Sequence, residues 1–214
     1  MHGFDTSIAF PFKTILIAEP PLDTLQRVRA STRALHERLD GRLPLLSPTL
    51  ALPEYRRLLA AFHGFYRPLE AQLDPIASRI ASLDWPQRRK THLLEADLAV
   101  LGTATDAVNA LSACSRLPTP SDECGTLGCL YVLEGATLGG QISLRALRET
   151  LGIDRASGAA FFSSYGDEVG PRWRRFLACL ATLKRADEID TAARVAAQTF
   201  QLLESWLAER EVLA

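Results

Sequence analysis

The segment from Gly128 to Gln141 constrains the fold more than any other part of this chain of 214 residues. Its apolar residues recur at the spacing of an α-helix, yet it contains four glycines, Gly128, Gly135, Gly139 and Gly140. Each glycine inside a helix costs about 0.5–1 kcal/mol relative to alanine, so four of them in one helix require a reason. A helix that carries them gains a surface without side chains, which another helix or a ligand can approach closely.

Three of these glycines share one face of the predicted helix. Gly135 follows Gly128 by seven residues and Gly139 follows Gly135 by four, which is helical spacing. One interpretation is a tight crossing of two helices through small residues. The other is a helix bent over a planar ligand, with Gly139 and Gly140 at the bend. The spacing alone leaves both interpretations open.

Composition limits the classes of function. Apolar residues make up 47% of the chain and charged residues 23%, which is ordinary for a soluble globular protein. The formal net charge of −1 argues against a general nucleic-acid or membrane-surface partner. No apolar run approaches the ~20 residues that span a bilayer, and no basic leader precedes the first apolar run. The four cysteines form no C-x-x-C pair, so we expect reduced thiols in a cytoplasmic protein.

The periodicity of the apolar residues predicts a fold made of helices alone. Four of the expected helices cover about residues 22–39, 86–113, 171–184 and 187–211. A further helix begins near Pro53 and is kinked or divided by Pro68. The glycine-bearing helix is expected to have Ser121 as its N-cap. No alternation of period two lasts long enough to indicate a strand. The sequence therefore predicts an irregular arm over residues 1–20 and one all-α domain over residues 21–214.

The first predicted helix carries the best candidate for a metal ligand. His36 lies on the edge of its apolar stripe, and Arg29 and Arg33 lie on the same side, seven and three residues earlier. A histidine in such a place is more often a satisfied boundary residue than a ligand. Neutral imidazole is nevertheless a common ligand of heme iron, and the two arginines suit the carboxylates of the same molecule.

Three runs in register resemble the heme oxygenase family. They are Thr-Arg-Ala-Leu-His at 32–36, a segment from Tyr55 to the Tyr-Arg-Pro-Leu-Glu run at 66–70, and Tyr-Val-Leu-Glu-Gly-Ala-Thr-Leu-Gly-Gly-Gln at 131–141. The similarity covers about residues 22–208 and is greatest to the bacterial branch that supplies biliverdin to phytochromes. It implies a single-domain, heme oxygenase-like multi-helix bundle, with heme between the first helix and the glycine helix.

The resemblance also implies roles for particular residues. His36 matches the family's proximal iron ligand. Gly135, Gly139 and Gly140 match the distal glycines, whose bare backbone leaves room for dioxygen on the iron. This match agrees with the face without side chains that the glycine spacing predicts.

Further residues match the rim of the heme site. Arg29, with Arg33 beside it, falls where the family places a basic partner of a heme propionate, and Arg174 falls near another such position. Phe200 matches a residue that packs on the porphyrin edge. The heme-binding set implied by the resemblance is therefore His36, Arg29, Arg33, Arg174 and Phe200.

The sequence departs from the family in its distal helix. The best-known members have Gly-Asp-x-Ser-Gly-Gly, in which the Asp organises water beside the bound oxygen. Here the matching run from Gly135 to Gly140 places Ala136 where the Asp would be. The expected substitutes in proton delivery are Thr137 or ordered water.

The resemblance implies an oxidoreductase that opens heme to biliverdin and releases carbon monoxide and iron. Heme is then both substrate and cofactor, dioxygen is consumed, and a ferredoxin or a reductase donates electrons. A bacteriophytochrome is the implied recipient of biliverdin. The alternative is a non-catalytic protein of the same fold that binds heme or another flat ligand, because a fold does not decide function. The position of His36 together with the glycine helix favours the enzyme.

Overall fold

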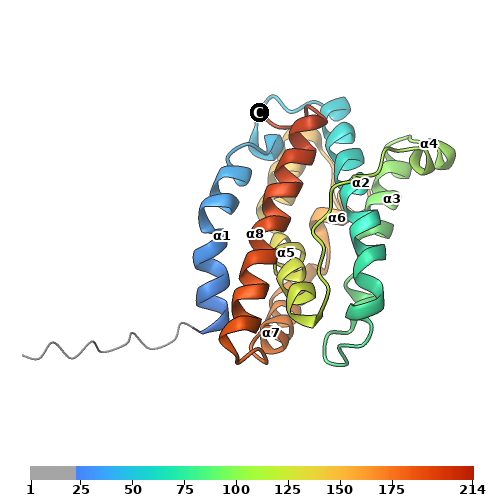
Figure 1. Ribbon diagram of the computed structural model, residues 1–214. Helices are drawn as coiled ribbons and strands as arrows, with labels where there is room; N and C mark the ends of the chain where they lie inside the picture. Colours follow the sequence, from blue (N-terminus) through green and yellow to red (C-terminus); the bar gives the residue numbers. More distant parts are fainter. Residues whose placement is uncertain (1–22) are drawn as a thin grey trace, which may run out of the picture.

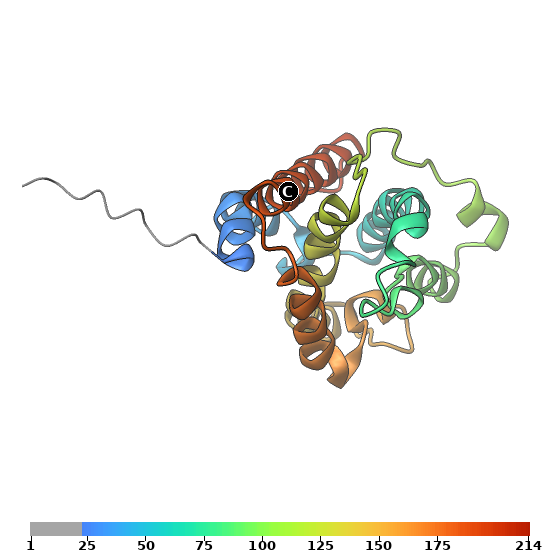
Figure 2. The same cartoon turned by 60° about the horizontal axis from the view of Figure 1, so that its bottom comes forward.

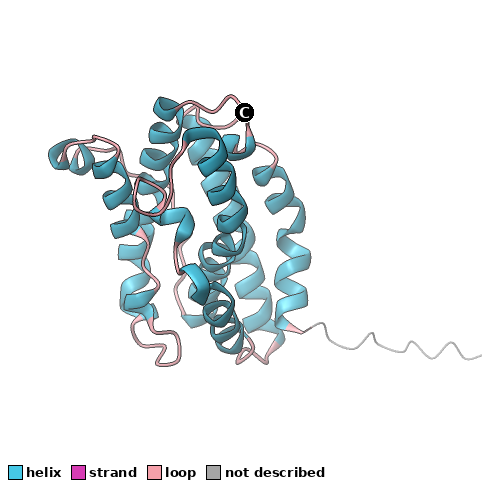
Figure 3. Cartoon of the chain, turned by 180° about the vertical axis from the view of Figure 1, so that it is seen from behind, coloured by secondary structure: helices cyan, strands magenta, loops and turns pink. Residues whose placement is uncertain are grey.

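The computed structural model describes residues 23–214, so the expected arm over residues 1–20 lies outside the described residues. Within residues 23–214 every regular element is helical (Figure 3), which confirms the all-α prediction. The α-helices are α1 (Thr24–Asp40), α2 (Leu52–Ala77), α3 (Thr91–Val100), α4 (Thr105–Asn109), α5 (Glu123–Leu151), α6 (Ala160–Ser163), α7 (Val169–Leu180) and α8 (Ala186–Glu209). Three-residue 3₁₀ turns are η1 (Pro44–Leu46), η2 (Trp85–Gln87) and η3 (Gly166–Glu168). None of these described helices is long and apolar enough to cross a membrane.

Helix α8 joins the two helices that carry the candidate residues, because it packs against both α1 and α5 (Figures 1 and 2). Gly128 makes the crossing with α5 close: a Cβ atom at this position would overlap the carbonyl oxygen of Ala192 in α8. On the α1 side, Arg38 donates from Nε to both carboxylate oxygens of Glu204 at 2.9 Å. The small-residue interpretation of the glycines is therefore correct for Gly128.

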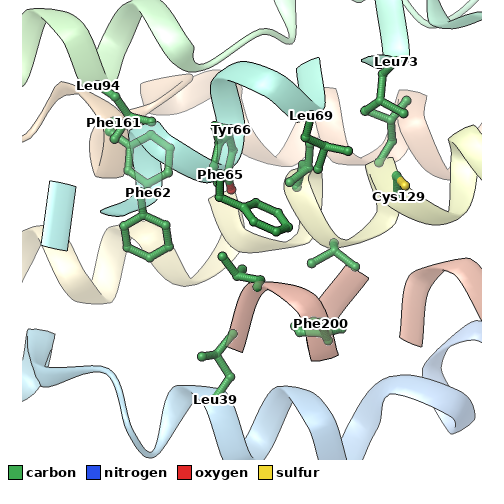
Figure 4. Close-up of a cluster of buried hydrophobic side chains, with 14 of the residues drawn as sticks. Leu39, Phe62, Phe65, Tyr66, Leu69, Leu73, Leu94, Cys129, Phe161 and Phe200 are labelled. Carbon is green, nitrogen blue, oxygen red and sulfur yellow. The ribbon is translucent and has the colours of Figure 1, made fainter. Parts of the chain in front are cut away.

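Helix α2 supplies much of the aromatic core (Figure 4). The ring of Tyr66 meets that of Phe161 edge to face, with 5.2 Å between centroids. The ring centroid of Phe62 lies 5.5 Å from that of Phe161. Pro68 does not divide α2, which continues from Leu52 to Ala77, so division, one of the two outcomes expected from sequence, is wrong. Residues on both sides of it, including Phe65 and Leu69, are buried, and this burial offsets the hydrogen bond that a proline removes.

The helix predicted over residues 86–113 is shorter and divided in the structure. Helix α3 begins at Thr91, where the buried Glu70 carboxylate accepts hydrogen bonds from the backbone N–H and the hydroxyl of this threonine. The helix ends before Gly102, whose φ of +87° is a left-handed conformation that suits glycine, and α4 follows separately.

The predicted cap of the glycine helix is also displaced by one residue. Asp122, not Ser121, accepts from the N–H of Gly125 at 2.8 Å.

We predict opposite effects of alanine at two glycines of α5. Gly128→Ala should lower the free energy of unfolding by about 1–3 kcal/mol, because the methyl group forces α5 and α8 apart. Gly139→Ala should raise it by up to about 1 kcal/mol, because a Cβ there meets no atom within 4 Å and helix propensity improves. Urea unfolding of the ligand-free protein, followed by circular dichroism, measures both values. Equal losses of stability would contradict this division of the glycines.

Candidate heme site

His36 projects from α1 into solvent and is available to a ligand. Its side chain is 57% exposed, and its Nε2 lies 3.1 Å from the carboxylate of Asp40, one turn later. The imidazole ring also approaches the ring of Phe200 in α8, with 5.7 Å between centroids. Because imidazole has two nitrogens, one can bind a metal while the other donates to Asp40 after the ring turns.

Exposed arginines lie on α1 and on a helix that contacts it. Arg29 and Arg33 are exposed and lie two turns and one turn before His36, respectively, on the same side of the helix. Arg174 is exposed on α7, and α7 contacts α1. The structure therefore places the predicted arginines on neighbouring helices, where they can meet carboxylates of a bound molecule. Phe200 is mostly buried, and its ring lies beside that of His36.

Helix α5 presents a bare strip of backbone at two of its glycines. A Cβ atom at Gly139 would meet nothing within 4 Å, and one at Gly135 would only touch the Trp173 ring at 3.9 Å. Leu138 and Ile142 border this strip and are 44% and 65% exposed. An open glycine strip beside exposed apolar side chains suits a flat apolar ligand.

Two of the predicted distal residues lie elsewhere on α5. A Cβ atom at Gly140 would overlap the carbonyl oxygen of Phe162, so this glycine permits close packing of α6. Thr137 is buried, and its hydroxyl donates to the carbonyl oxygen of Glu134 at 2.7 Å. Residues two apart point to nearly opposite sides of a helix, so Thr137 faces away from both Gly135 and Gly139. The structure does not bring the Thr137 hydroxyl to the open strip.

An aromatic pair that the sequence reasoning missed borders the glycine strip. Tyr131, one turn before Gly135, lies 5.8 Å from the ring of Trp173, which in turn stacks on Phe176 at 5.5 Å. Trp173 and Phe176 are three residues apart, and this spacing indicates that they share one face of α7. The spacing does not indicate which other helix that face contacts. The Trp173 ring of α7 therefore borders the strip at Gly135.

The arrangement resembles solved heme oxygenases in its overall fold. The structure superimposes on heme oxygenase from Leptospira interrogans with a TM-score of 0.72 and 18% identity, covering 88% of this chain and 100% of that one. It matches the NO- and CO-bound heme oxygenase from Neisseria meningitidis with a TM-score of 0.73 and 21% identity, covering 90% and 94%. Heme oxygenase-1 from Synechocystis sp. PCC 6803, solved in complex with heme, superimposes with a TM-score of 0.72 and 14% identity. The match covers 88% of this chain and 92% of that one. At these identities the likeness establishes the fold, which is the single-domain, all-helical heme oxygenase fold.

Sequence comparison establishes the family. Residues 22–209 match the heme oxygenase family. A heme oxygenase of Xanthomonas campestris pv. campestris is 34% identical over 144 residues, which are 63% of this chain and 79% of the relative. The chain belongs to the heme oxygenase family. It is an enzyme of heme degradation, and heme is its substrate.

Exposure of His36 on the arginine-bearing side of α1 leads to a prediction for heme binding. His36→Ala should weaken hemin binding and alter the absorbance spectrum of the complex, because the iron loses its protein ligand. The matched control is His92→Ala, which removes an exposed histidine from α3 and should leave the spectrum unchanged. An absorbance titration with hemin measures both variants. An unchanged spectrum for His36→Ala would exclude this residue as the ligand.

Proposed function

We propose that heme lies between the α1 face and the glycine strip of α5, with His36 as the axial ligand of iron. The support is a fit between the residues and the molecule. An accessible imidazole suits the iron, the open strip at Gly139 suits the flat ring, and the exposed arginines suit the propionates. Arg29, Arg33 and Arg174 would then set how the ring is rotated in its plane.

In this proposal the glycine strip is the distal wall. Heme supplies the iron at which dioxygen is reduced when electrons arrive, and the protein orients and shields it. Gly135 and Gly139 keep the space beside the iron narrow and free of side chains, so the oxygen can reach the ring edge. The reaction opens heme to biliverdin and releases carbon monoxide and iron.

Proton delivery in this chain cannot use the carboxylate of the best-known members, because Ala136 stands in its place. Of the two substitutes expected from sequence, we favour ordered water over Thr137. The Thr137 hydroxyl already donates its hydrogen to a backbone carbonyl and faces away from the strip. Water that enters along the exposed strip has no such competitor.

The proposed partners follow from the same chemistry. The reaction requires electrons, so we propose a ferredoxin or a reductase as the donor. The run Gly-Ala-Thr-Leu-Gly-Gly at 135–140 resembles the phytochrome-linked branch, and we propose that biliverdin passes to a bacteriophytochrome. The four cysteines are free thiols, which favours a cytoplasmic location.

Single-turnover chemistry tests the proposal directly. With dioxygen, an electron donor and catalase to remove free peroxide, the hemin complex should lose its Soret band and gain the red absorption of biliverdin. The physical reason is the combination of one neutral histidine with an opposite wall that offers no second ligand. A complex that binds dioxygen stably and never opens the ring would instead favour the alternative of a heme-binding protein.

A second test concerns the strip itself. Gly139→Val should preserve the helical circular dichroism while lowering product formation, because the branched side chain fills the space opposite the iron. The matched control is Gln141→Val, which places the same side chain at an exposed position on nearly the opposite side of α5. Product formation is measured as biliverdin per heme. Equal losses of product in the two variants would contradict the assignment of Gly139 to the distal wall.

A further inference from the structure

A buried group of charged side chains lies behind the glycine strip. Glu134 immediately precedes Gly135 and is 1% exposed. Its Oε1 accepts a hydrogen bond from the Tyr165 hydroxyl at 2.7 Å and lies 3.2 Å from Lys90 Nζ, while Arg88 pairs with its Oε2. Lys90 Nζ also donates to the Tyr165 oxygen, so three groups converge on one carboxylate.

Stability alone does not explain this group. Burial lowers the pKa of Lys90, and the nearby Glu134 carboxylate opposes that shift. Burial likewise raises the pKa of Tyr165, which keeps its hydroxyl protonated as a donor. Buried ion pairs of this kind are often no more stabilising than apolar residues of similar volume. Their directional bonds do specify one position of the groups that they join, here the start of the glycine strip.

A second contact fastens α5 at the other end of the strip. There Gly140 lets the backbone of Phe162 approach α5 closely. The chain then passes through Ser164, which has φ 40° and ψ −111° and a buried hydroxyl without a hydrogen-bond partner in the described structure. Such a conformation persists only where the surroundings enforce it. Ser164 lies between Phe162 and Tyr165 in the chain. One strained segment therefore makes both contacts with α5, at Gly140 through Phe162 and at Glu134 through Tyr165.

We propose that the segment from Phe162 to Tyr165 clamps α5 at Glu134 and Gly140, and so holds the intervening glycine strip in one position. Glu134 and Tyr165 are then positioning residues for the distal wall. Neither belongs to the open strip, and they act through the helix backbone. A glycine-rich helix needs such a clamp because its bare face makes no side-chain contacts of its own. The consequence for catalysis rests on the proposed function, whereas the clamp itself does not.

Backbone hydrogen exchange tests the clamp without heme. In the ligand-free protein, Tyr165→Phe and Glu134→Gln should speed amide exchange over residues 134–140 by about tenfold, because each removes a bond to the buried carboxylate or weakens its charge. The matched control is Tyr55→Phe. This variant also loses a buried tyrosine hydroxyl that holds the α6 region, through its 2.9 Å bond to the carbonyl of Gly158, but that bond does not reach α5. Amides in α8 serve as the internal reference for global unfolding.

The CO-bound heme complex gives the second readout. Tyr165→Phe should broaden or split the C–O stretching band and change the ratio of biliverdin isomers, while hemin affinity stays within about twofold of wild type. Tyr55→Phe should change neither. The clamp would be overturned if amide exchange over residues 134–140 in both Tyr165→Phe and Glu134→Gln were no faster than in the control variant Tyr55→Phe. Failure of the wild type to open heme would contradict the proposed function and leave the exchange result to judge the clamp.

Discussion

The close contact between Gly128 of α5 and Ala192 of α8 is the constraint on which the other arrangements depend. It lets the two backbones meet, and α8 in turn carries α1 on another side. The relative positions of His36 and the glycine strip are therefore set through a helix that supplies Phe200 to the site. In the proposed function a rigid flat molecule lies between α1 and α5, and α8, which packs against both, would hold their separation.

The glycines of α5 differ in their surroundings because this helix meets different neighbours along its length. Gly128 and Gly140 lie against backbone, of α8 and of the α6 segment, and replace side chains that would not fit. Gly135 and Gly139 lie between them, where an added Cβ atom would approach nothing closer than the Trp173 ring at 3.9 Å. Close packing is therefore correct for Gly128 and Gly140, and ligand access at Gly135 and Gly139 stays a prediction.

Polar chemistry is distributed unusually around this helix. The strip that faces the proposed ligand has no ionisable group, and Ala136 stands where the best-known relatives have a carboxylate. The charged residue of the segment, Glu134, is instead buried on another side and paired with cations. In the proposed arrangement this charge positions the distal wall, and the oxygen chemistry on the open side would depend on backbone shape and solvent.

Local information in the sequence determined the helical class, the approximate course of α1, α7 and α8, and the candidacy of His36, because helical periodicity and residue chemistry are properties of short segments. It did not determine that Pro68 leaves α2 intact, since only burial of its neighbours offsets the lost hydrogen bond. It also could not separate Gly139 from Gly140, or show that Thr137 turns away and that Trp173 borders the strip. Those features depend on which element covers each side of α5, and contacts between segments far apart in the chain decide that.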